Sequence, residues 1–281
     1  MTQPISVAAI QMTSGQQLSG NLESASVLLE QAANGGAQLA VLPENFAVYG
    51  GDYRATAGQF EQLKGWLCEQ ASRLNMAIIG GSVPAIRRPD GSEVAAPRVR
   101  TRALAVSADG QCLAAYDKLH LFDAQVNDAQ GRYCESDVFE PGTEVVTVPL
   151  AGLTVGLAIC YDLRFPALAQ RLAQAGADLI VYPSAFTAVT GAAHWSMLLR
   201  ATAVQTGCYV LGANQCGQHG PRRASYGHSM LVNPWGEVVA SLENAPAALV
   251  AGRDLATMNE LRQRMPVQTH QRFHIEGPYE R

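Results

Sequence analysis

Residues 154–166 read Thr-Val-Gly-Leu-Ala-Ile-Cys-Tyr-Asp-Leu-Arg-Phe-Pro, and this stretch decides the expected fold. Its apolar run from Val155 to Ile159 predicts a buried strand. Pro166 suits the first position of a helix, because the N–H that proline lacks is not needed there, and Gly176 suits a left-handed helix end. Cys160 is therefore expected at the carboxyl end of a strand, where α/β proteins place reactive groups. A buried free cysteine that acts as a small hydrophobe is the alternative.

The chain before this stretch alternates predicted strands with predicted helices. Apolar runs predict strands over residues 5–12, 38–42 and 76–83. Asn21 is the expected N-cap of the first helix, and Thr56 with Gln59 resembles a capping box for the second. This order of elements is typical of a layered α/β fold.

The remainder of the chain continues in the same way around one long polar segment. Residues 101–106 and 112–116 predict a hairpin, whereas residues 118–142 are expected to form a long surface loop. Further strands are expected over 178–182, 208–213, 225–232, 237–240 and 247–250, and helices over 194–205 and 258–265. Because no repeat or linker interrupts the pattern, we expect one domain over 1–281, with the tail 266–281 packing at a subunit interface.

Composition narrows the class of protein. The chain has 281 residues, of which 48% are hydrophobic, and a formal net charge of −4, so we expect a sizeable core and no nucleic-acid partner. No apolar stretch reaches membrane-spanning length and no signal-peptide pattern opens the chain. The six cysteines are scattered, unlike the framework of a small secreted domain. A cytoplasmic enzyme or binding protein with no membrane partner is expected.

Three polar side chains follow predicted strands. Glu44 comes after the strand that ends in Leu42, Lys118 follows the second strand of the hairpin, and Cys160 ends the strand described first. Taken separately, Glu44 or Lys118 is as well explained as an ordinary surface residue. Taken together, a thiol, a carboxylate and an ammonium group supply the nucleophile, base and oxyanion stabiliser of acyl transfer.

Three segments resemble the signature segments of the nitrilase, or carbon–nitrogen hydrolase, superfamily. They are Leu-Pro-Glu-Asn-Phe at 42–46, Tyr-Asp-Lys-Leu-His-Leu-Phe at 116–122, and Gly-Leu-Ala-Ile-Cys-Tyr-Asp-Leu-Arg-Phe-Pro at 156–166. They occur in that family's order and carry its Glu–Lys–Cys triad. The resemblance implies a four-layer α-β-β-α sandwich, no metal or organic cofactor, and a homodimer or higher homo-oligomer.

Further segments are similar to the branch of deaminated glutathione amidases and ω-amidases. They include Tyr-Cys-Glu-Ser at 133–136, Tyr-Pro-Ser-Ala-Phe-Thr at 182–187 and Arg-Ala-Ser-Tyr-Gly-His-Ser at 223–229. This resemblance implies hydrolysis of a small carboxylate-bearing amide, with deaminated glutathione as the expected substrate. Hydrolysis of α-ketoglutaramate or another small amide, acyl transfer to an amine, and a catalytically silent scaffold remain the alternatives.

The resemblance also implies roles for individual residues. Glu44 is expected to accept the Cys160 proton, donate it to the departing amine, and then activate water against the thioester. Lys118 and the backbone N–H of Tyr161 are expected to hold the oxyanion. Glu135 matches the family's second glutamate and is expected to hold Lys118 and the substrate in register. A carboxylate on the loop surface is the alternative for Glu135.

A substrate carboxylate requires a cation. Arg164, four positions beyond Cys160, is the best placed candidate, because a guanidinium can bind a carboxylate through two hydrogen bonds. The alternative is a structural ion pair of Arg164 with Asp162 or another acid, in which case the carboxylate site is sought near Thr187, Arg222 or Arg223. Phe186 and Thr187, which follow a predicted strand, are expected to line the pocket.

A metal site is the rival chemistry for the C-terminal half. Cys208, Cys216, His219 and His228 lie close together in the sequence. Their spacing lacks the paired cysteines of structural zinc sites, so no metal is expected. His194 and His228 are expected to be hydrogen-bonded core residues.

Overall fold

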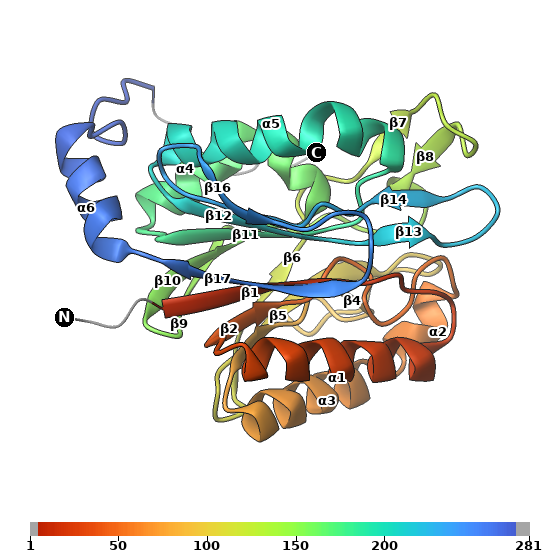
Figure 1. Ribbon diagram of the computed structural model, residues 1–281. Coiled ribbons are helices and arrows are strands. Elements are labelled where there is room, and N and C mark those ends of the chain that lie inside the picture. The colour runs from red at the N-terminus through yellow and green to blue at the C-terminus, as the bar shows by residue number, and fades with distance from the viewer. Residues whose placement is uncertain (1–4, 274–281) are drawn as a thin grey trace.

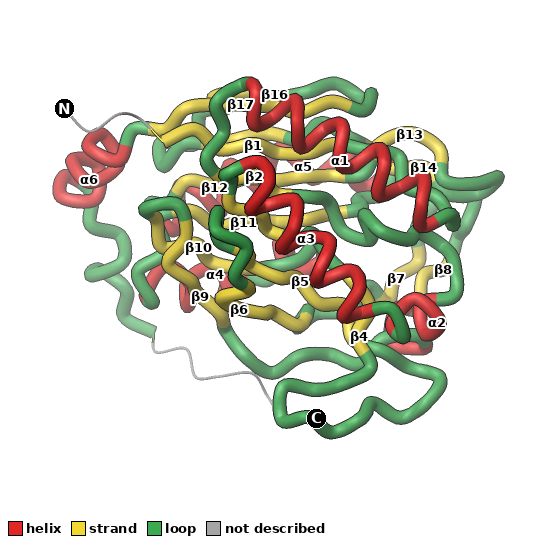
Figure 2. The backbone as a smooth tube through the Cα atoms, turned by 90° about the horizontal axis from the view of Figure 1, so that it is seen from below, coloured by secondary structure: helices red, strands yellow, loops and turns green. Residues whose placement is uncertain are grey.

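Two β-sheets face each other between two layers of helices in the computed structural model, which describes residues 5–273 (Figure 1). The first sheet has the strand order β17-β1-β2-β3-β5-β4, with β6 paired to β5. The second has the order β16-β15-β12-β11-β10-β9. Helices α1 and α3 cover the first sheet, and α4 and α5 cover the second (Figures 1 and 2). The predicted four-layer sandwich is therefore confirmed.

The strands of the first sheet are β1 (Ile5–Gln11), β2 (Leu39–Val41), β3 (Ala77–Ile79), β4 (Val83–Ala85), β5 (Arg100–Val106), β6 (Cys112–Asp117) and β17 (Ala247–Arg253). Those of the second are β9 (Val146–Leu150), β10 (Leu153–Leu157), β11 (Leu179–Ser184), β12 (Tyr209–Asn214), β15 (Met230–Val232) and β16 (Val238–Ser241). Two small hairpins, β7 (Asp123–Gln125) with β8 (Arg132–Cys134) and β13 (Cys216–Gln218) with β14 (Ala224–Tyr226), complete the strands.

The helices are α1 (Leu18–Asn34), α2 (Tyr53–Ala57), α3 (Phe60–Leu74), α4 (Pro166–Gln174), α5 (Ala188–Thr206) and α6 (Leu255–Arg264). Pro166 occupies the start of α4 and Gly176 follows its end with φ of +87°, both as predicted. Within residues 5–273, no helix has the length and apolar character needed to cross a membrane.

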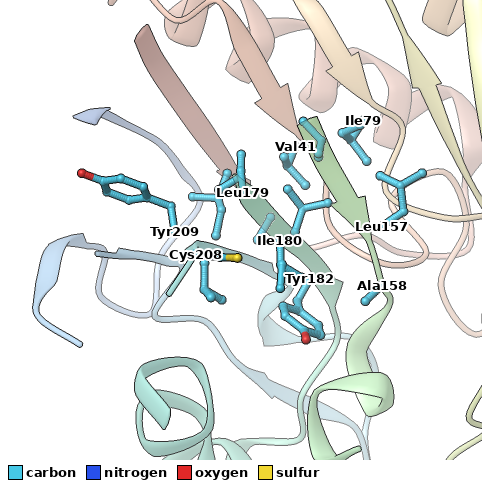
Figure 3. Packing of buried hydrophobic residues seen from close by; sticks show 14 of the residues in the cluster. Val41, Ile79, Leu157, Ala158, Leu179, Ile180, Tyr182, Cys208 and Tyr209 are labelled. Carbon is cyan, nitrogen blue, oxygen red and sulfur yellow. The ribbon is translucent and has the colours of Figure 1, made fainter. Parts of the chain in front are cut away.

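The main core lies between the two sheets. Val41 and Ile79 of the first sheet approach Leu157 and Ile180 of the second, and all are fully buried (Figure 3). Burial of one such side chain contributes about 1.5–3 kcal/mol. A second cluster fills the space between the first sheet and helices α1 and α3. The main core holds the two sheets face to face, and the second cluster holds α1 and α3 against the first sheet.

Parallel pairing puts the chemically important strand ends together. In the second sheet, β10 pairs with β11 and β11 with β12, all parallel. In the first sheet, β1, β2 and β3 are parallel in the same way. Parallel neighbours end at the same edge of a sheet. Residues that follow β10 and β11 therefore lie at one edge of the second sheet, and the residues after β2 meet them in one cavity, which Glu44, Cys160 and Phe186 line together.

Two strands predicted as continuous are interrupted, and the prediction was wrong there. The segment 76–83 divides into β3 and β4, because Gly81, with φ of +43°, passes so close to Pro43 that a side chain would collide with its carbonyl oxygen. The segment 225–232 divides into β14 and β15, because Gly227 and His228 both adopt positive φ. Local backbone turns thus override the apolar pattern.

Two predicted helix caps were also wrong. Helix α1 begins at Leu18, and the Asn21 side chain is used instead to bond Gly15 and Ala47. Asp52 caps the short helix α2, whereas the Gln59 side chain makes no cap bond at the start of α3. In each case a tertiary or neighbouring side-chain contact takes the place of the expected local signal.

Helix α5 and the polar segment also differ from prediction. Helix α5 starts at Ala188, six residues before the predicted start, because the Thr187 side chain accepts a hydrogen bond from the Thr190 backbone N–H. The predicted loop at 118–142 contains the β7–β8 hairpin and a 3-10 turn over Glu135–Asp137. Within the C-terminal tail, Gln268 bonds Thr206 of its own chain, and residues 274–281 lie outside the described residues.

Candidate active site

The Cys160 turn connects strand β10 to helix α4. Cys160 has φ of +47°, an uncommon conformation for a residue with a side chain, and begins a 3-10 turn that ends at Arg164. The buried Asp162 carboxylate holds this turn, because it accepts hydrogen bonds from the Ile159 N–H at 2.8 Å and the Tyr116 hydroxyl at 2.7 Å. The strain at Cys160 is thus maintained by contacts around it, as is common at functional sites.

Lys118 is the centre of a buried charge cluster. Its Nζ lies 2.7 Å from Glu44 Oε1 and 2.8 Å from both carboxylate oxygens of Glu135. The Lys118 residue is only 1% exposed. The Glu135 carboxylate also accepts the backbone N–H of Phe122 at 2.6 Å, which fixes it to the loop after β6. The alternative of a surface residue is excluded for Glu44 and Lys118, and Glu135 pairs with Lys118 instead of solvent.

The electrostatic environment couples these groups. Burial alone would lower the pKa of Lys118. The negative charges of the Glu135 and Glu44 carboxylates outweigh this effect, so the pKa of Lys118 is raised well above its usual value. Burial also raises the pKa of Glu135. Burial and the negative charge of Glu44 raise the pKa of the Cys160 thiol, against the smaller opposing effect of Lys118. The Cys160 thiol and the Glu44 carboxylate therefore influence each other electrostatically.

One cavity contains most of the predicted site residues, and we call it the thiol cavity. It is open to solvent and encloses about 310 Å³ including its mouth. Its lining residues are Glu44, Phe122, Glu135, Cys160, Tyr161, Arg164, Ala185, Phe186, Thr187, Thr190 and Arg223. The structure thus brings together residues from both sheets that are more than 100 positions apart.

Arg164 faces the thiol cavity and does not pair with Asp162. Its guanidinium carbon lies 5.2 Å from the centre of the Phe186 ring, and its Nη1 lies 3.2 Å from His194 Nδ1. Among residues 5–273, no carboxylate forms an ion pair with it. The alternative of an Arg164–Asp162 ion pair is therefore wrong, since Asp162 bonds Tyr116 and the Cys160 turn instead.

Phe186 and Thr187 reach the cavity for different reasons. The Phe186 N–H donates to Asn214 Oδ1 at 3.0 Å, which ties the end of β11 to β12. Thr187 is the N-cap of α5. Sequence reasoning missed Phe122 and Thr190 as lining residues. Phe122 lies at the end of the second signature segment, but Thr190 carries no signal until the true start of α5 is known.

The rival metal residues have separate partners. Cys208 Sγ lies 3.0 Å from the Ala177 carbonyl oxygen, and Cys216 Sγ lies 3.4 Å from Thr13 Oγ1. His219 contacts Ser14 and Ser225, and His228 contacts the Tyr226 carbonyl. In the part of the chain that the structure describes, no three potential ligands gather closely enough to hold a metal ion.

Comparisons with known proteins identify the family to which the chain belongs. The family model described as carbon–nitrogen hydrolase matches residues 6–263. A human protein named deaminated glutathione amidase is 40% identical over 279 residues, which cover 96% of this chain and 83% of that protein. The crystal structure of the NitFhit protein of Caenorhabditis elegans superposes with a TM-score of 0.85 at 35% identity, over 97% of this chain and 66% of that chain.

A second similar structure bears on the cysteine. An amidase from Nesterenkonia of the nitrilase superfamily has a TM-score of 0.76 and 25% identity, over 93% of this chain and 96% of that chain. In one variant of that amidase, the acetamide moiety of fluoroacetamide is covalently added at the active-site cysteine. Taken with the family model and the human relative, these findings confirm the predicted family. The chain belongs to the carbon–nitrogen hydrolase family.

Proposed function

We propose that this enzyme is an amidase that uses Cys160 as the nucleophile and Glu44 as the general base. The observation that carries the proposal is the position of the Lys118 ammonium, 2.7 Å from Glu44 and 2.8 Å from Glu135, since both of these carboxylates line the cavity with Cys160. A thiol needs a base because only the thiolate is strongly nucleophilic. The covalent addition at the cysteine of the Nesterenkonia amidase supports the same role for Cys160.

The first half of the proposed reaction forms a thioester. The Cys160 proton passes to Glu44 as sulfur attacks the amide carbon, and the carbonyl π electrons move to oxygen. Lys118 and the Tyr161 backbone N–H stabilise that oxyanion. When the oxyanion collapses, the C–N bond breaks and its electron pair leaves with nitrogen, which takes the proton from Glu44. The products of this half are the free amine and an acyl-Cys160 thioester.

The second half regenerates the enzyme. Glu44 removes a proton from water, the hydroxide adds to the thioester carbon, and the same two donors hold the second oxyanion. Collapse then breaks the C–S bond, and sulfur recovers the proton from Glu44. Glu135 holds Lys118 in place during both halves through its paired contacts at 2.8 Å. The carboxylic acid leaves with one oxygen from water.

Deaminated glutathione is the substrate that we propose. The human relative at 40% identity bears the name of that activity. The acyl portion of deaminated glutathione is an α-keto acid with a free carboxylate. Binding this carboxylate requires a cation on the acyl side of the cavity. We assign this role to Arg164, which lines the cavity beside Phe186 and Thr187 and has no carboxylate partner among the described residues. Such a bidentate contact contributes about 1.5–3 kcal/mol.

The test compares cysteine variants on one substrate. Cys160→Ala should abolish hydrolysis of deaminated glutathione, whereas Cys208→Ala should lose only a few-fold, because Cys208 lies in the core and bonds the Ala177 carbonyl. Mass spectrometry of wild-type enzyme quenched during turnover should detect an acyl adduct on Cys160. Full activity of the Cys160→Ala protein would exclude the thioester mechanism. Faster turnover of α-ketoglutaramate by the wild-type enzyme would favour the ω-amidase alternative.

A further inference from the structure

A second, larger cavity adjoins the thiol cavity. It encloses about 1100 Å³ including its open mouth. Four residues line both cavities: Glu44, Phe122, Glu135 and Arg223. Most of its other lining residues come from the loop after β2, the start of α2, the β7–β8 hairpin and the β13–β14 hairpin, and they include Tyr49, Tyr53, Tyr133, His219 and Arg222. We call it the tyrosine cavity. A ligand that begins at Cys160 can therefore extend past Glu44 into this space.

Arg223 forms part of the wall shared by the two cavities. Its guanidinium carbon lies 4.6 Å from the centre of the Tyr133 ring and 5.4 Å from that of Tyr49. Its Nη2 donates to the Ala185 carbonyl at 3.0 Å. These contacts hold the guanidinium plane between aromatic faces, an arrangement that stabilises a cation without neutralising it.

The charge of Arg223 has no carboxylate partner. Among residues 5–273, no ion pair includes it, and its Nε is buried without a hydrogen-bond acceptor. Asp128 is the acid whose charge interacts with it, but the Asp128 carboxylate accepts the Tyr133 hydroxyl at 2.7 Å and the Gly131 N–H at 2.9 Å. Glu44 and Glu135 are held by Lys118. A buried guanidinium with an unused donor favours the binding of an anionic group from a ligand, because the anion compensates the buried charge and accepts the free hydrogen bond.

The position of Glu44 indicates which half of a substrate enters the tyrosine cavity. In the proposed mechanism Glu44 protonates the departing nitrogen, so that nitrogen must come within hydrogen-bond reach of its carboxylate. Arg164 and Phe186 line only the thiol cavity, whereas Glu44 lines both. The acyl half therefore lies towards Arg164, and the amine half passes Glu44 towards Arg223 and the two tyrosine rings.

We propose that Arg223 binds a carboxylate on the amine half of the substrate, so that the enzyme selects amides whose departing amine is a short peptide with a free C-terminus. This inference rests on the proposed function. It assigns the two guanidiniums to the two ends of one substrate: Arg164 to the acyl carboxylate and Arg223 to the carboxylate of the departing amine. A primary amide, which releases only ammonia, leaves the tyrosine cavity and Arg223 unused.

The experiment uses two synthetic amides that differ only at one end. Both carry a 2-oxoglutaryl group, whose carbonyl distant from the keto group forms an amide bond with the amino group of alanylglycine. One ends in a free carboxylate and the other in a neutral carboxamide. The wild-type enzyme should have at least a tenfold higher kcat/KM for the free acid. Arg223→Gln should reduce this preference to less than threefold, because the amide side chain cannot form the paired charged contact.

A matched control uses the other guanidinium. Arg164→Gln should lower kcat/KM for both amides by the same factor, since both share the acyl carboxylate. Arg223→Lys, which keeps the charge, should retain part of the preference. Because each preference is a ratio within one protein, partial misfolding of a variant cancels from it. An Arg223→Gln protein that keeps the wild-type preference would overturn the inference and leave Arg223 as a support for the hairpin.

Binding separates this inference from the proposed function. Calorimetry with Cys160→Ala protein should give at least tenfold tighter binding of the free acid than of the carboxamide, and the Cys160→Ala/Arg223→Gln protein should bind the two equally. If the wild-type enzyme hydrolyses neither amide nor any other, the proposed function fails while the binding preference still tests Arg223. Equal binding of both amides by Cys160→Ala protein would overturn the inference even if hydrolysis is observed.

Discussion

Two buried clusters of charged side chains begin at consecutive residues of the chain and differ in composition. The arginine cluster surrounds Asp117, and the Lys118 cluster surrounds Lys118. Asp117 closes strand β6, and Lys118 follows it. Successive side chains along an extended chain point to opposite sides. Asp117 accordingly pairs with arginines of the first sheet, whereas Lys118 pairs with Glu44 and Glu135 at the thiol cavity. A comparison of the two clusters separates structural charge from charge that is available for chemistry.

The arginine cluster is closely paired. Asp117 accepts Arg102 Nε at 2.6 Å and Arg102 Nη2 at 2.8 Å, and Arg100 Nη1 at 2.9 Å. Glu140 accepts Arg88 Nε at 2.7 Å and Arg100 Nη2 at 2.8 Å. Each carboxylate is thus held by two guanidiniums, and the Arg88 and Arg100 contacts lower the pKa of Glu140 to about 2. Glu140 therefore remains ionised at neutral pH.

In the Lys118 cluster, carboxylates outnumber cations. One ammonium is shared by two carboxylates, and a thiol lies in the same cavity. Burial raises the pKa of Glu135 and of Cys160. With more acidic groups than cations, this cluster has a carboxylate that can accept a proton without leaving a cation unpaired. The two clusters, although both are buried, thus differ in the ratio of carboxylates to cations: two carboxylates with three guanidiniums around Asp117, and two carboxylates with one ammonium around Lys118.

The largest effect is expected from breaking the arginine cluster. Asp117→Asn keeps the shape of the side chain but removes the only carboxylate that pairs with Arg102 among the described residues. Removing one partner of a buried ion pair costs about 3–5 kcal/mol. Urea unfolding should detect this loss, while kcat/KM per folded molecule stays within a few-fold. If kcat/KM per folded molecule also falls by more than a few-fold, the Asp117 pairing contributes to activity as well as to stability.

Breaking the Lys118 cluster should have the reverse outcome. Lys118→Met removes an oxyanion donor, so kcat/KM for the amide should fall by about 10²–10³. The unfolding free energy should change less than in Asp117→Asn, because two neighbouring carboxylates without a cation can share a proton. Steady-state kinetics and urea unfolding on the same protein test both statements. A stable Lys118→Met protein with normal kinetics would remove Lys118 from the mechanism.

The smallest effect concerns acid stability. The pKa of Glu140 is lowered in the folded protein from 4.5 to about 2, so its stabilising contribution is complete above pH 4.5 and is lost as pH falls towards 2. Glu140→Gln should therefore reduce stability at neutral pH by about 1 kcal/mol after allowance for solvent screening.

The difference in unfolding free energy between Glu140→Gln and wild type should become smaller as the pH is lowered from 6 to 3. Urea unfolding at several pH values measures this difference. Glu30→Gln is the matched control, since Glu30 forms only an exposed pair with Arg73 at 3.8 Å. That control should change stability little at either pH. A Glu140→Gln difference that does not vary with pH would mean that the carboxylate contributes by packing alone.

Much of the fold was predictable from local pattern. Apolar runs indicated the central strands, and Pro166 and Gly176 marked both ends of α4 correctly. The resemblance of three segments predicted the family, which the comparisons confirm. The errors occurred where distant parts of the chain approach closely. Gly81 turns because it passes Pro43, and Asn21 leaves its capping role because Gly15 and Ala47 bind its side chain.

Residue type and order at the strand ends are properties of the sequence, so Glu44, Lys118 and Cys160 could be named as candidate site residues without the fold. Only the tertiary structure decided how they meet. Lys118 pairs with Glu44 from 74 positions away, and Arg164 turns towards Phe186 because Asp162 is engaged by Tyr116. From the sequence, Arg223 was one of several alternative carboxylate sites, and the tyrosine cavity beside it arises only where separate loops pack at one sheet edge. Side-chain charge is local, but burial and pairing are properties of the packed molecule.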